Sequence, residues 1–367
     1  MQVLEATFNI GLLALGLVML SQGSEYFVEA ASKLARAAGV SELYIGLTLV
    51  AIGTSLPEIV SSSVAIAAGS ADLAFGNILG SVMANLTLVV GLSAIFAPLA
   101  SNAVILDRDA KIMIFIVLFL GFSVFDPFTP SQITAYEGII LLLLFVTYLL
   151  FLYDSRDECE TCYQFKVFVD FLIRLRFLTT LRGIARGPSP TEPFTDESTD
   201  QEVGARPTLQ EHRRPYREII IVTLAAVGVV VGAQFAIQGA VNISFSWGIS
   251  EGVIGLTVIA LGTSLPEIMV SVNSARKGFG RLLIGNVIGS NIITITLGLG
   301  FGVFAGPTSI DPLTAGLLVG LSLFISILFY YIIKMDWRVT RREGTILLLC
   351  YVLSQIAIFG ILQLGGF

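Results

Sequence analysis

The sequence predicts an all-α integral membrane protein with ten transmembrane helices, arranged as two inverted repeats of five helices each. Three observations support this prediction: the composition, the distribution of positive charge and an internal repeat. Apolar residues make up 55% of the 367-residue chain and charged residues only 13%, whereas a soluble domain carries about 25% charged residues. Such a chain lacks the polar surface that a water-soluble protein needs.

Ten apolar segments are long enough to be membrane spans, each of which requires about 20 mainly apolar residues. They lie at approximately residues 6–32, 42–68, 72–97, 110–126, 134–153, 217–241, 249–274, 281–305, 310–334 and 344–366. The one long polar stretch is 154–216. We therefore divide the chain into a first repeat (1–153), an insert (154–216) and a second repeat (217–367).

The positive charges all fall on one side of these predicted spans. If the N-terminus is outside, all 21 lysine and arginine residues lie in cytoplasmic segments. Those segments are 33–40, 98–111, 154–217, 275–281 and 334–343. Because cytoplasmic loops of membrane proteins are enriched in Lys and Arg, we expect both termini outside, the insert in the cytoplasm, and the protein in the plasma membrane.

Two motifs recur at an offset of 209 residues. GLTLVAIGTSLPEI at 46–59 returns as GLTVIALGTSLPEI at 255–268, and GNILGS at 76–81 returns as GNVIGS at 285–290. Five spans per copy is an odd number, so the second copy must enter the membrane from the opposite face. This is the inverted-repeat arrangement of many secondary transporters, whose substrate site lies near mid-membrane between the repeats.

A glutamate stands in each longer motif, Glu58 in the first and Glu267 in the second, inside an otherwise apolar span. An ionised carboxylate in a membrane normally faces a cavity or a cation. Duplication for helix packing alone would account for the repeated glycines but not for these carboxylates. The preceding Pro57 and Pro266 each remove a backbone hydrogen bond, so we expect adjoining carbonyl groups to turn toward an ion.

The polar groups near the glutamates all offer oxygen, including the hydroxyls of Thr and Ser and the amide of Asn85. Hard cations take such ligands, and calcium prefers six to eight of them, whereas magnesium dehydrates reluctantly. The single histidine, His212, lies in the insert, so zinc, copper and iron are poor candidates. We expect a hard cation, calcium rather than magnesium, at this site and no cofactor.

The paired GTSLPE motifs, each followed by GN(I/V)(L/I)GS, resemble the alpha repeats of the sodium/calcium exchangers within the cation/calcium antiporter superfamily. The resemblance covers the chain except the insert. It implies a secondary antiporter that exchanges sodium for calcium by alternating access. It also implies a core of the second, third, seventh and eighth spans, against which the first and sixth move. The ion ligands that it implies are Glu58, Glu267, the carbonyls of Ala51, Thr54, Ala260 and Thr263, and the side chains of Ser55, Ser81, Ser264, Ser290, Asn85 and Thr294.

Thr294 departs from this resemblance, because the well-studied microbial exchangers carry an aspartate there. Two glutamates give the site two negative charges, which one calcium ion, two sodium ions or two protons would balance. A third sodium ion would leave net positive charge in a low-dielectric setting. We therefore expect fewer than three sodium ions per calcium, or partial use of protons. Alternatively, Thr294 is a neutral variant without effect on the stoichiometry.

Three other functions remain open. The nearest is a proton-coupled antiporter for calcium or another divalent cation, although that branch usually carries GNATE in place of GTSLPE. A channel would also place oxygen atoms at mid-membrane, but channels usually build filters from rings of subunits. An intramembrane hydrolase using Glu58 and Glu267 as acid and base is the most distant, since the sequence has no HExxH motif. We do not expect an enzyme.

Three lesser features concern the first span and the insert. Glu25 and Glu29, one helical turn apart, either reach the membrane interface or line the cytoplasmic ion path. In the insert, the region from Phe165 to Arg182 combines aromatic with basic residues, which is typical of a helix on the inner leaflet. Residues 187–216 have the composition of a flexible tether. The expected partners are the transported ions and the lipid bilayer, with no nucleic acid and no obligate protein partner.

Overall fold

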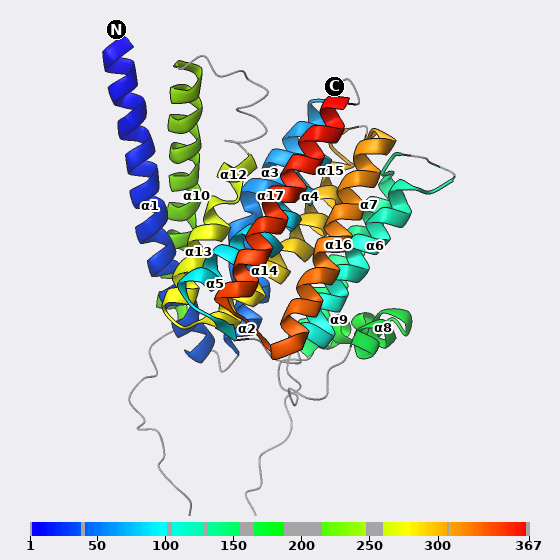
Figure 1. The fold of residues 1–367 in the computed structure, drawn as a ribbon. Helices are drawn as coiled ribbons and strands as arrows, with labels where there is room; N and C mark the ends of the chain where they lie inside the picture. Colours follow the sequence, from blue (N-terminus) through cyan, green and yellow to red (C-terminus); the bar gives the residue numbers. More distant parts are fainter. Residues whose placement is uncertain are drawn as a thin grey trace, which may run out of the picture.

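The computed structural model describes residues 2–37, 41–100, 105–127, 129, 131–154, 165–186, 215–246, 260–306 and 308–364 (Figure 1). Within these residues the regular structure is helical, apart from two strands of two residues each. Seven of the described helical segments are long and apolar enough to cross a membrane: Thr7–Ala35, Leu43–Ala67, Ala71–Phe96, Ala135–Asp154, Arg217–Gly239, Gly280–Gly302 and Pro312–Asp336. The chain is therefore an all-α, multi-pass membrane protein.

Three of the ten predicted spans are not among these seven. Segment 110–126 falls on a helix of only 14 residues, preceded by a charged turn, and segment 344–366 falls on a helix that opens with two arginines. Segment 249–274 lies partly outside the described residues. The number ten therefore stays a prediction.

The first half of the chain folds into helices interrupted by short π-helical turns, labelled η. Their bounds are α1 (Gln2–Ala37), α2 (Glu42–Ile45), η1 (Gly46–Val50), α3 (Ala51–Ala67), α4 (Ala71–Ala84), η2 (Asn85–Val89), α5 (Val90–Phe96), η3 (Ile105–Ala110), α6 (Lys111–Val124) and α7 (Ala135–Asp154). The insert adds α8 (Phe165–Ile173) and α9 (Arg176–Arg186). A helix satisfies its own backbone hydrogen bonds, which a lipid environment requires.

The described part of the second half is again mainly helical. Its bounds are α10 (Pro215–Ser246), α12 (Ala260–Thr263), α13 (Leu265–Arg276), α14 (Gly280–Ile293), η5 (Thr294–Leu299), α15 (Gly300–Gly302), α16 (Pro312–Asp336) and α17 (Arg341–Leu364). The π-helical turns η2 and η5 begin at Asn85 and Thr294, which are 209 residues apart. Turns of this kind are rare and are frequent at functional sites.

Local capping explains where α7 and α17 begin. Both helices follow the T-x-x-E pattern of a capping box. The backbone N–H of Thr134 donates to Glu137 Oε2 at 2.7 Å, and that of Thr340 donates to Glu343 Oε2 at the same distance. The carboxylates of Glu137 and Glu343 therefore cap the N-termini of α7 and α17.

The centre of the bundle is built on the close approach of α14 to α2 and η1. The segment Gly280–Gly302 is the most deeply buried of the candidate spans. A Cβ atom on Gly285 would lie 2.8 Å from the carbonyl oxygen of Leu43, and one on Gly289 would lie 2.7 Å from that of Leu47. The glycines of the GNVIGS motif therefore allow two backbones to touch. Gly285 contacts Leu43, and Gly289, four residues later, contacts Leu47, which is also four residues later. The segment α2–η1 and helix α14 therefore run in the same direction.

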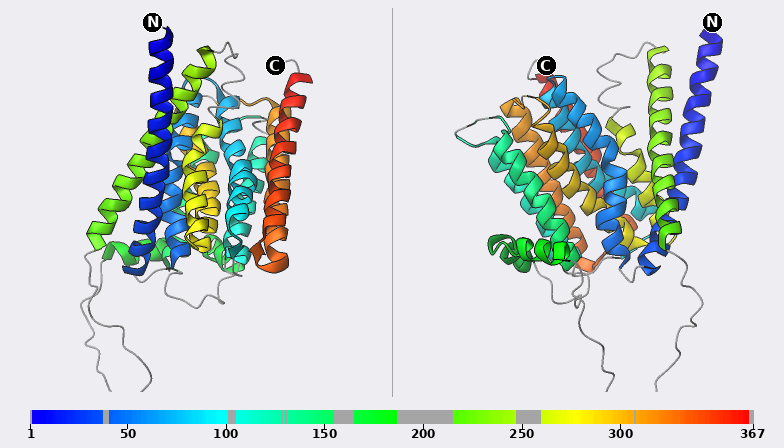
Figure 2. Two further views of the ribbon diagram at one scale, coloured as in Figure 1. Left: turned by 60° about the vertical axis from the view of Figure 1, so that its left-hand side comes forward. Right: turned by 180° about the vertical axis from the view of Figure 1, so that it is seen from behind.

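α1 and α10 form an antiparallel pair at one side of the bundle (Figures 1 and 2). A Cβ atom on Gly232 would lie 2.9 Å from the backbone nitrogen of Leu20, and one on Gly239 would lie 2.7 Å from that of Leu13. The two helices therefore pack backbone against backbone over several turns. These are the first and sixth of the predicted spans; their predicted movement against a core of other helices stays a prediction.

The two ends of the bundle differ. The first residues of α1 and the last residues of α17 lie at one end, while α8 and α9 run across the other (Figures 1 and 2). We call the second end the insert end. The two short strands, β1 (Leu99–Ala100) and β2 (Arg338–Val339), pair antiparallel with each other.

The insert helices are anchored on the bundle by aromatic contacts. Phe168 and Phe171 of α8 are each 1% exposed, and their rings meet the edge of Phe151 in α7 at centroid distances of 5.3 and 5.5 Å. The predicted amphipathic helix is in fact two helices, because the backbone turns at Leu175, whose φ is +53°. The predicted tether lies almost entirely outside the described residues.

Candidate ion-binding site

Two glutamates from distant parts of the sequence share one buried region. Glu58 lies in α3 and Glu267 in the first turn of α13, and each is 1% exposed. The Ser55 hydroxyl donates to Glu267 Oε1 at 3.4 Å. The two GTSLPE motifs therefore meet in space, as the repeat predicts.

The backbone around the two prolines differs between the copies. α3 continues as a helix through Pro57, where the missing N–H leaves the Gly53 carbonyl without its usual partner. In the second copy the helix is interrupted at Ser264, and Pro266 stands near the start of α13, where no N–H is needed. The irregular backbone expected at both prolines is thus present only at the second.

Several oxygen atoms in this region have no hydrogen-bond partner among the described residues. They are both carboxylate oxygens of Glu58, Oε2 of Glu267, Oδ1 of Asn85 and Oγ of Ser264. Buried polar groups are nearly always hydrogen-bonded, and a buried carboxylate without a partner is strongly unfavourable. A group of unpaired oxygens that includes two carboxylates fits a hard cation such as calcium or sodium.

The two copies also contact each other through hydroxyl and amide groups. The Thr54 hydroxyl lies 3.1 Å from Oδ1 of Asn286, to which it donates, and 3.3 Å from the hydroxyl of Ser290. Thr54 is 2% exposed, and Asn286 and Ser290 are fully buried. Thr54 of the first GTSLPE motif therefore contacts the GNVIGS motif of the second copy.

Most of the remaining predicted ligands are buried side chains. Ser81 donates to the backbone carbonyl of Asn77 at 2.8 Å, within its own helix turn. Asn85 and Thr294, 2% and 1% exposed, begin η2 and η5 respectively. Also buried are Ala51 and Thr263. Ala260 begins α12, and its side chain lies outside the described residues.

Three asparagines at the site were not predicted from the sequence. Asn286 contacts Thr54, and Asn291 accepts a 3.0 Å hydrogen bond from the Asn85 amide. Asn77 donates to the backbone carbonyl of Glu58 at 3.4 Å. The repeat could have identified Asn77 and Asn286, because they recur at the same 209-residue offset as the glutamates. Asn291 has valine as its equivalent, so no sequence signal marked it.

The charge of the site is set by two carboxylates. Among the residues that the structure describes, no three acidic, histidine or cysteine side chains gather in one place. Glu25 and Glu29, the other candidates for the ion path, face Lys277, whose Nζ lies 3.4 and 3.8 Å from their carboxylates. Glu29 also pairs with Lys33 at 2.7 Å. These two glutamates therefore already have cationic partners.

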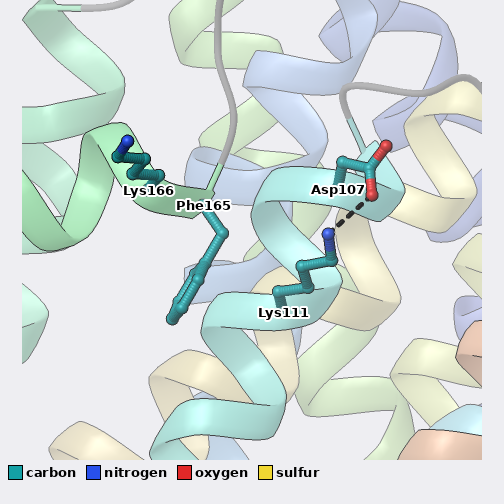
Figure 3. Close-up of a pocket in the computed structure, with 4 residues that line it drawn as sticks. All are labelled: Asp107, Lys111, Phe165 and Lys166. Carbon is teal, nitrogen blue, oxygen red and sulfur yellow. Dashed lines mark hydrogen bonds and ion pairs between the residues drawn. The ribbon is translucent and has the colours of Figure 1, made fainter.

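A separate pocket of about 360 Å³ opens where α8 meets η3 and α6 (Figure 3). Asp107, Lys111, Phe165 and Lys166 line it. The ammonium group of Lys111 lies 2.7 Å from Asp107 Oδ1, so this carboxylate is paired within the protein. None of the predicted ion ligands lines the pocket.

Comparison with known proteins decides the family. Residues 8–153 and 218–360 match the family described as sodium/calcium exchanger protein. The chain belongs to the sodium/calcium exchanger family. The resemblance inferred from the paired motifs is thereby confirmed, and the match is interrupted at the insert. Because this is a family of membrane transporters, the chain is a transporter rather than an enzyme.

Individual relatives agree with this assignment along most of the chain. The chain is 34% identical over 354 residues to the sodium/calcium exchanger MaX1 of Methanosarcina acetivorans, covering 96% of this chain and 99% of that protein. It is 30% identical over 251 residues to the inner membrane protein YrbG of Escherichia coli, covering 68% and 65% of the two chains. Its structure superposes on the sodium-calcium exchanger NCX_Mj with a TM-score of 0.72 at 28% identity, covering 94% and 97%. The exchanger fold thus extends over nearly the whole chain.

Proposed function

We propose that this protein is a secondary antiporter that exchanges sodium for calcium by alternating access, with the ions held at mid-membrane by Glu58 and Glu267. The observation that carries the proposal is the pair of buried glutamates. Three of their four carboxylate oxygens have no hydrogen-bond partner among the described residues. Protein groups that offer only oxygen around two negative charges suit calcium and sodium. The hydroxyls and carbonyls of the GTSLPE segments, together with Asn85, would complete the coordination.

Backbone pairing at the two ends of α16 supports an inverted repeat. At one end, β1 pairs with β2, which brings Ala100 opposite Arg338. At the other end, Ser309 pairs with Gln132 in an isolated bridge. Ser309 lies 209 residues after Ala100, so equivalent segments of the two copies make the same pairing at opposite ends of the bundle. A two-fold axis in the membrane plane would relate the copies in this way.

Glycine contacts between helices support the same relation. A Cβ atom on Gly344 would lie 2.8 Å from the carbonyl oxygen of Gly91, and one on Gly300 would lie 3.4 Å from that of Gly138. Gly300 follows Gly91 by 209 residues, and Gly344 follows Gly138 by 206. The last helix of each copy, α7 or α17, therefore packs against a helix of the other copy through an equivalent pair of glycines. Five spans in each copy, ten in all, would produce this pattern.

The insert end of the bundle is proposed to face the cytoplasm. Basic residues of the insert helices α8 and α9 lie there, and the first and last helices have their free ends at the opposite side (Figure 1). Positive residues concentrate on the cytoplasmic side of membrane proteins. Both termini would then lie outside.

The proposal is tested by calcium flux into sodium-loaded vesicles. The purified protein is reconstituted and diluted into sodium-free buffer that contains radioactive calcium. We expect uptake that requires internal sodium and that falls to background in Glu58→Gln and in Glu267→Gln. The matched control is Glu137→Gln, which also alters a buried carboxylate but keeps an acceptor oxygen for the Thr134 cap.

Two outcomes would overturn the proposal in different ways. Uptake driven by a proton gradient and indifferent to sodium would assign the protein to proton-coupled calcium transport. Uptake that persists in both glutamine variants would remove Glu58 and Glu267 from the ion site. Loss of uptake in the Glu137→Gln control as well would show that the losses reflect damage to the fold.

A further inference from the structure

Four buried or half-buried residues near the ion site form two equivalent pairs. Ser62 and Asn77 belong to the first copy, and Ser271 and Asn286 stand 209 residues later in the second. Each serine follows its glutamate by four residues, and each asparagine belongs to a GNxxGS motif. The residue types are identical in the two copies, so the same hydrogen bonds are chemically possible in both.

In the first copy this pair is bonded. Asn77 Nδ2 donates to the hydroxyl of Ser62 at 2.9 Å and lies 3.1 Å from the hydroxyl of Ser61. It also reaches the carbonyl oxygen of Glu58 at 3.4 Å. The Asn77 amide thus ties α4 to α3 immediately beside the ion site, and these three bonds lie within its own copy.

In the second copy the equivalent pair is not bonded. Ser271 Oγ and Asn286 Nδ2 are both fully buried and have no hydrogen-bond partner among the described residues. Asn286 instead accepts the hydroxyl of Thr54, which belongs to the first copy, at 3.1 Å. A buried donor and a buried acceptor left without partners are unfavourable. In the described conformation, the serine–asparagine hydrogen bond is therefore made in the first copy and missing in the second.

We propose that Asn77 and Asn286 are positioning residues that exchange partners when the transporter turns its ion site from one side of the membrane to the other. In the exchanged conformation, Asn286 donates to Ser271 within the second copy, and Asn77 turns across to Thr263, the equivalent of Thr54. Every group needed for the exchanged set of bonds is present in the sequence. The inference rests on the proposed alternating access, because two copies of one sequence can trade their conformations.

Close backbone contacts hold the second GNxxGS helix against the first copy. A Cβ atom on Gly289 would lie 2.7 Å from the carbonyl oxygen of Leu47, and one on Gly285 would lie 2.8 Å from that of Leu43. Asn286 lies between these two glycines, so the described conformation places it beside the first copy.

At the insert end, α1 is joined to the α13 region by side chains that only the second copy supplies. Lys277, the residue after α13, pairs with glutamates of α1, and Asn273 Nδ2 donates to Ser24 of α1 at 2.7 Å. At the equivalent positions of the opposite end, Lys277 is replaced by Ala68 and Asn273 by Val64. The described conformation thus fastens α1 to α13 at the insert end, and the exchanged conformation would release it.

The test compares Ser62→Ala with Ser271→Ala. Ser62→Ala removes a hydrogen bond that only the described conformation makes, so it favours the exchanged one. Ser271→Ala removes a bond that only the exchanged conformation makes, so it favours the described one. The controls are Ser63→Ala and Ser274→Ala, whose hydroxyls each donate to a carbonyl of their own helix. One such bond changes the ratio of the two conformations about fivefold.

The readout is hydrogen–deuterium exchange of the insert-end peptides of α1 and α13, measured in lipid nanodiscs of the full chain without a gradient. We expect exchange to rise in Ser62→Ala, to fall in Ser271→Ala and to stay unchanged in the controls. Equal behaviour of the two variants, or a change in the same direction, would overturn the proposal. Because this readout needs no transport, it stays distinct from a failure of sodium/calcium exchange, which the vesicle flux of the unaltered protein reports.

Discussion

The number of carboxylates in the site predicts how transport responds to the membrane potential. Two glutamates carry two negative charges, and Thr294 stands, 1% exposed, where a third carboxylate would be expected from the family resemblance. One calcium ion or two sodium ions balance this charge. We therefore expect one calcium to exchange for two sodium ions, with no net charge moved in a cycle.

The magnitude of the alternative follows from the charge that it would move. Exchange of three sodium ions for one calcium transfers one elementary charge across the membrane. A potential of 100 mV acts on that charge with about 2.3 kcal/mol. Since 1.4 kcal/mol corresponds to a tenfold change, the calcium ratio at equilibrium would shift roughly 50-fold. For two sodium ions per calcium the shift is zero.

The assay sets a fixed sodium ratio across the vesicle membrane and clamps the potential with a potassium gradient and an ionophore. The measured quantity is the ratio of internal to external calcium once net flux has stopped. We expect the same ratio at 0 and at 100 mV, and a slope of two when its logarithm is plotted against the logarithm of the sodium ratio. A shift approaching 50-fold would refute the argument from two carboxylates.

A single substitution tests the same argument in reverse. Thr294→Asp would add a third carboxylate, and we expect this variant to carry current if a third sodium ion then binds. Thr294→Val, which is similar in shape and uncharged, should remain insensitive to potential. If the unaltered protein and Thr294→Asp respond to potential identically, Thr294 is the neutral variant of the other interpretation.

Three further predictions concern the packing around the site. Gly91→Ala would place a Cβ 2.7 Å from a backbone oxygen of α17, so we expect about 1–3 kcal/mol of destabilisation in thermal unfolding, against little change in Gly320→Ala, where nothing lies within 4 Å. Phe168→Ala removes an aromatic anchor on Phe151, and proteolysis at the insert should become faster; unchanged cleavage would mean that α8 is held otherwise. Lys277→Gln breaks exposed ion pairs that contribute about 1 kcal/mol or less, so thermal stability should barely change while hydrogen exchange at the insert end rises; slower exchange would contradict its role in fastening α1.

The repeated motifs were informative because they record chemistry locally. A carboxylate in an apolar run has few roles, and its recurrence at 209 residues indicated that Glu58 and Glu267 share one site. The structure brings the two motifs together through Ser55 and Thr54. The ligand roles of the twelve predicted residues stay predictions, which the flux experiments above address.

Other features could not be predicted from the sequence. Asn291 faces Asn85 because η2 and α14 pack side by side, and nothing in its local sequence distinguishes it from other polar residues in helices. The predicted insert helix is two helices because the backbone turns at Leu175, a residue type that seldom adopts positive φ. In both cases, contacts with distant segments determined the outcome.

The sequence by itself determined the membrane class, the approximate positions of most helices, the duplication and the residues most suited to a cation. It did so because apolar run length, charge and repeated motifs are properties of the chain alone. Only the tertiary structure decided which hydrogen bonds form: Asn77 is bonded within its copy while Asn286, identical in motif, reaches across to the other. Equal sequences can differ in this way because a hydrogen bond depends on ångström-scale placement of backbones that come from remote parts of the chain.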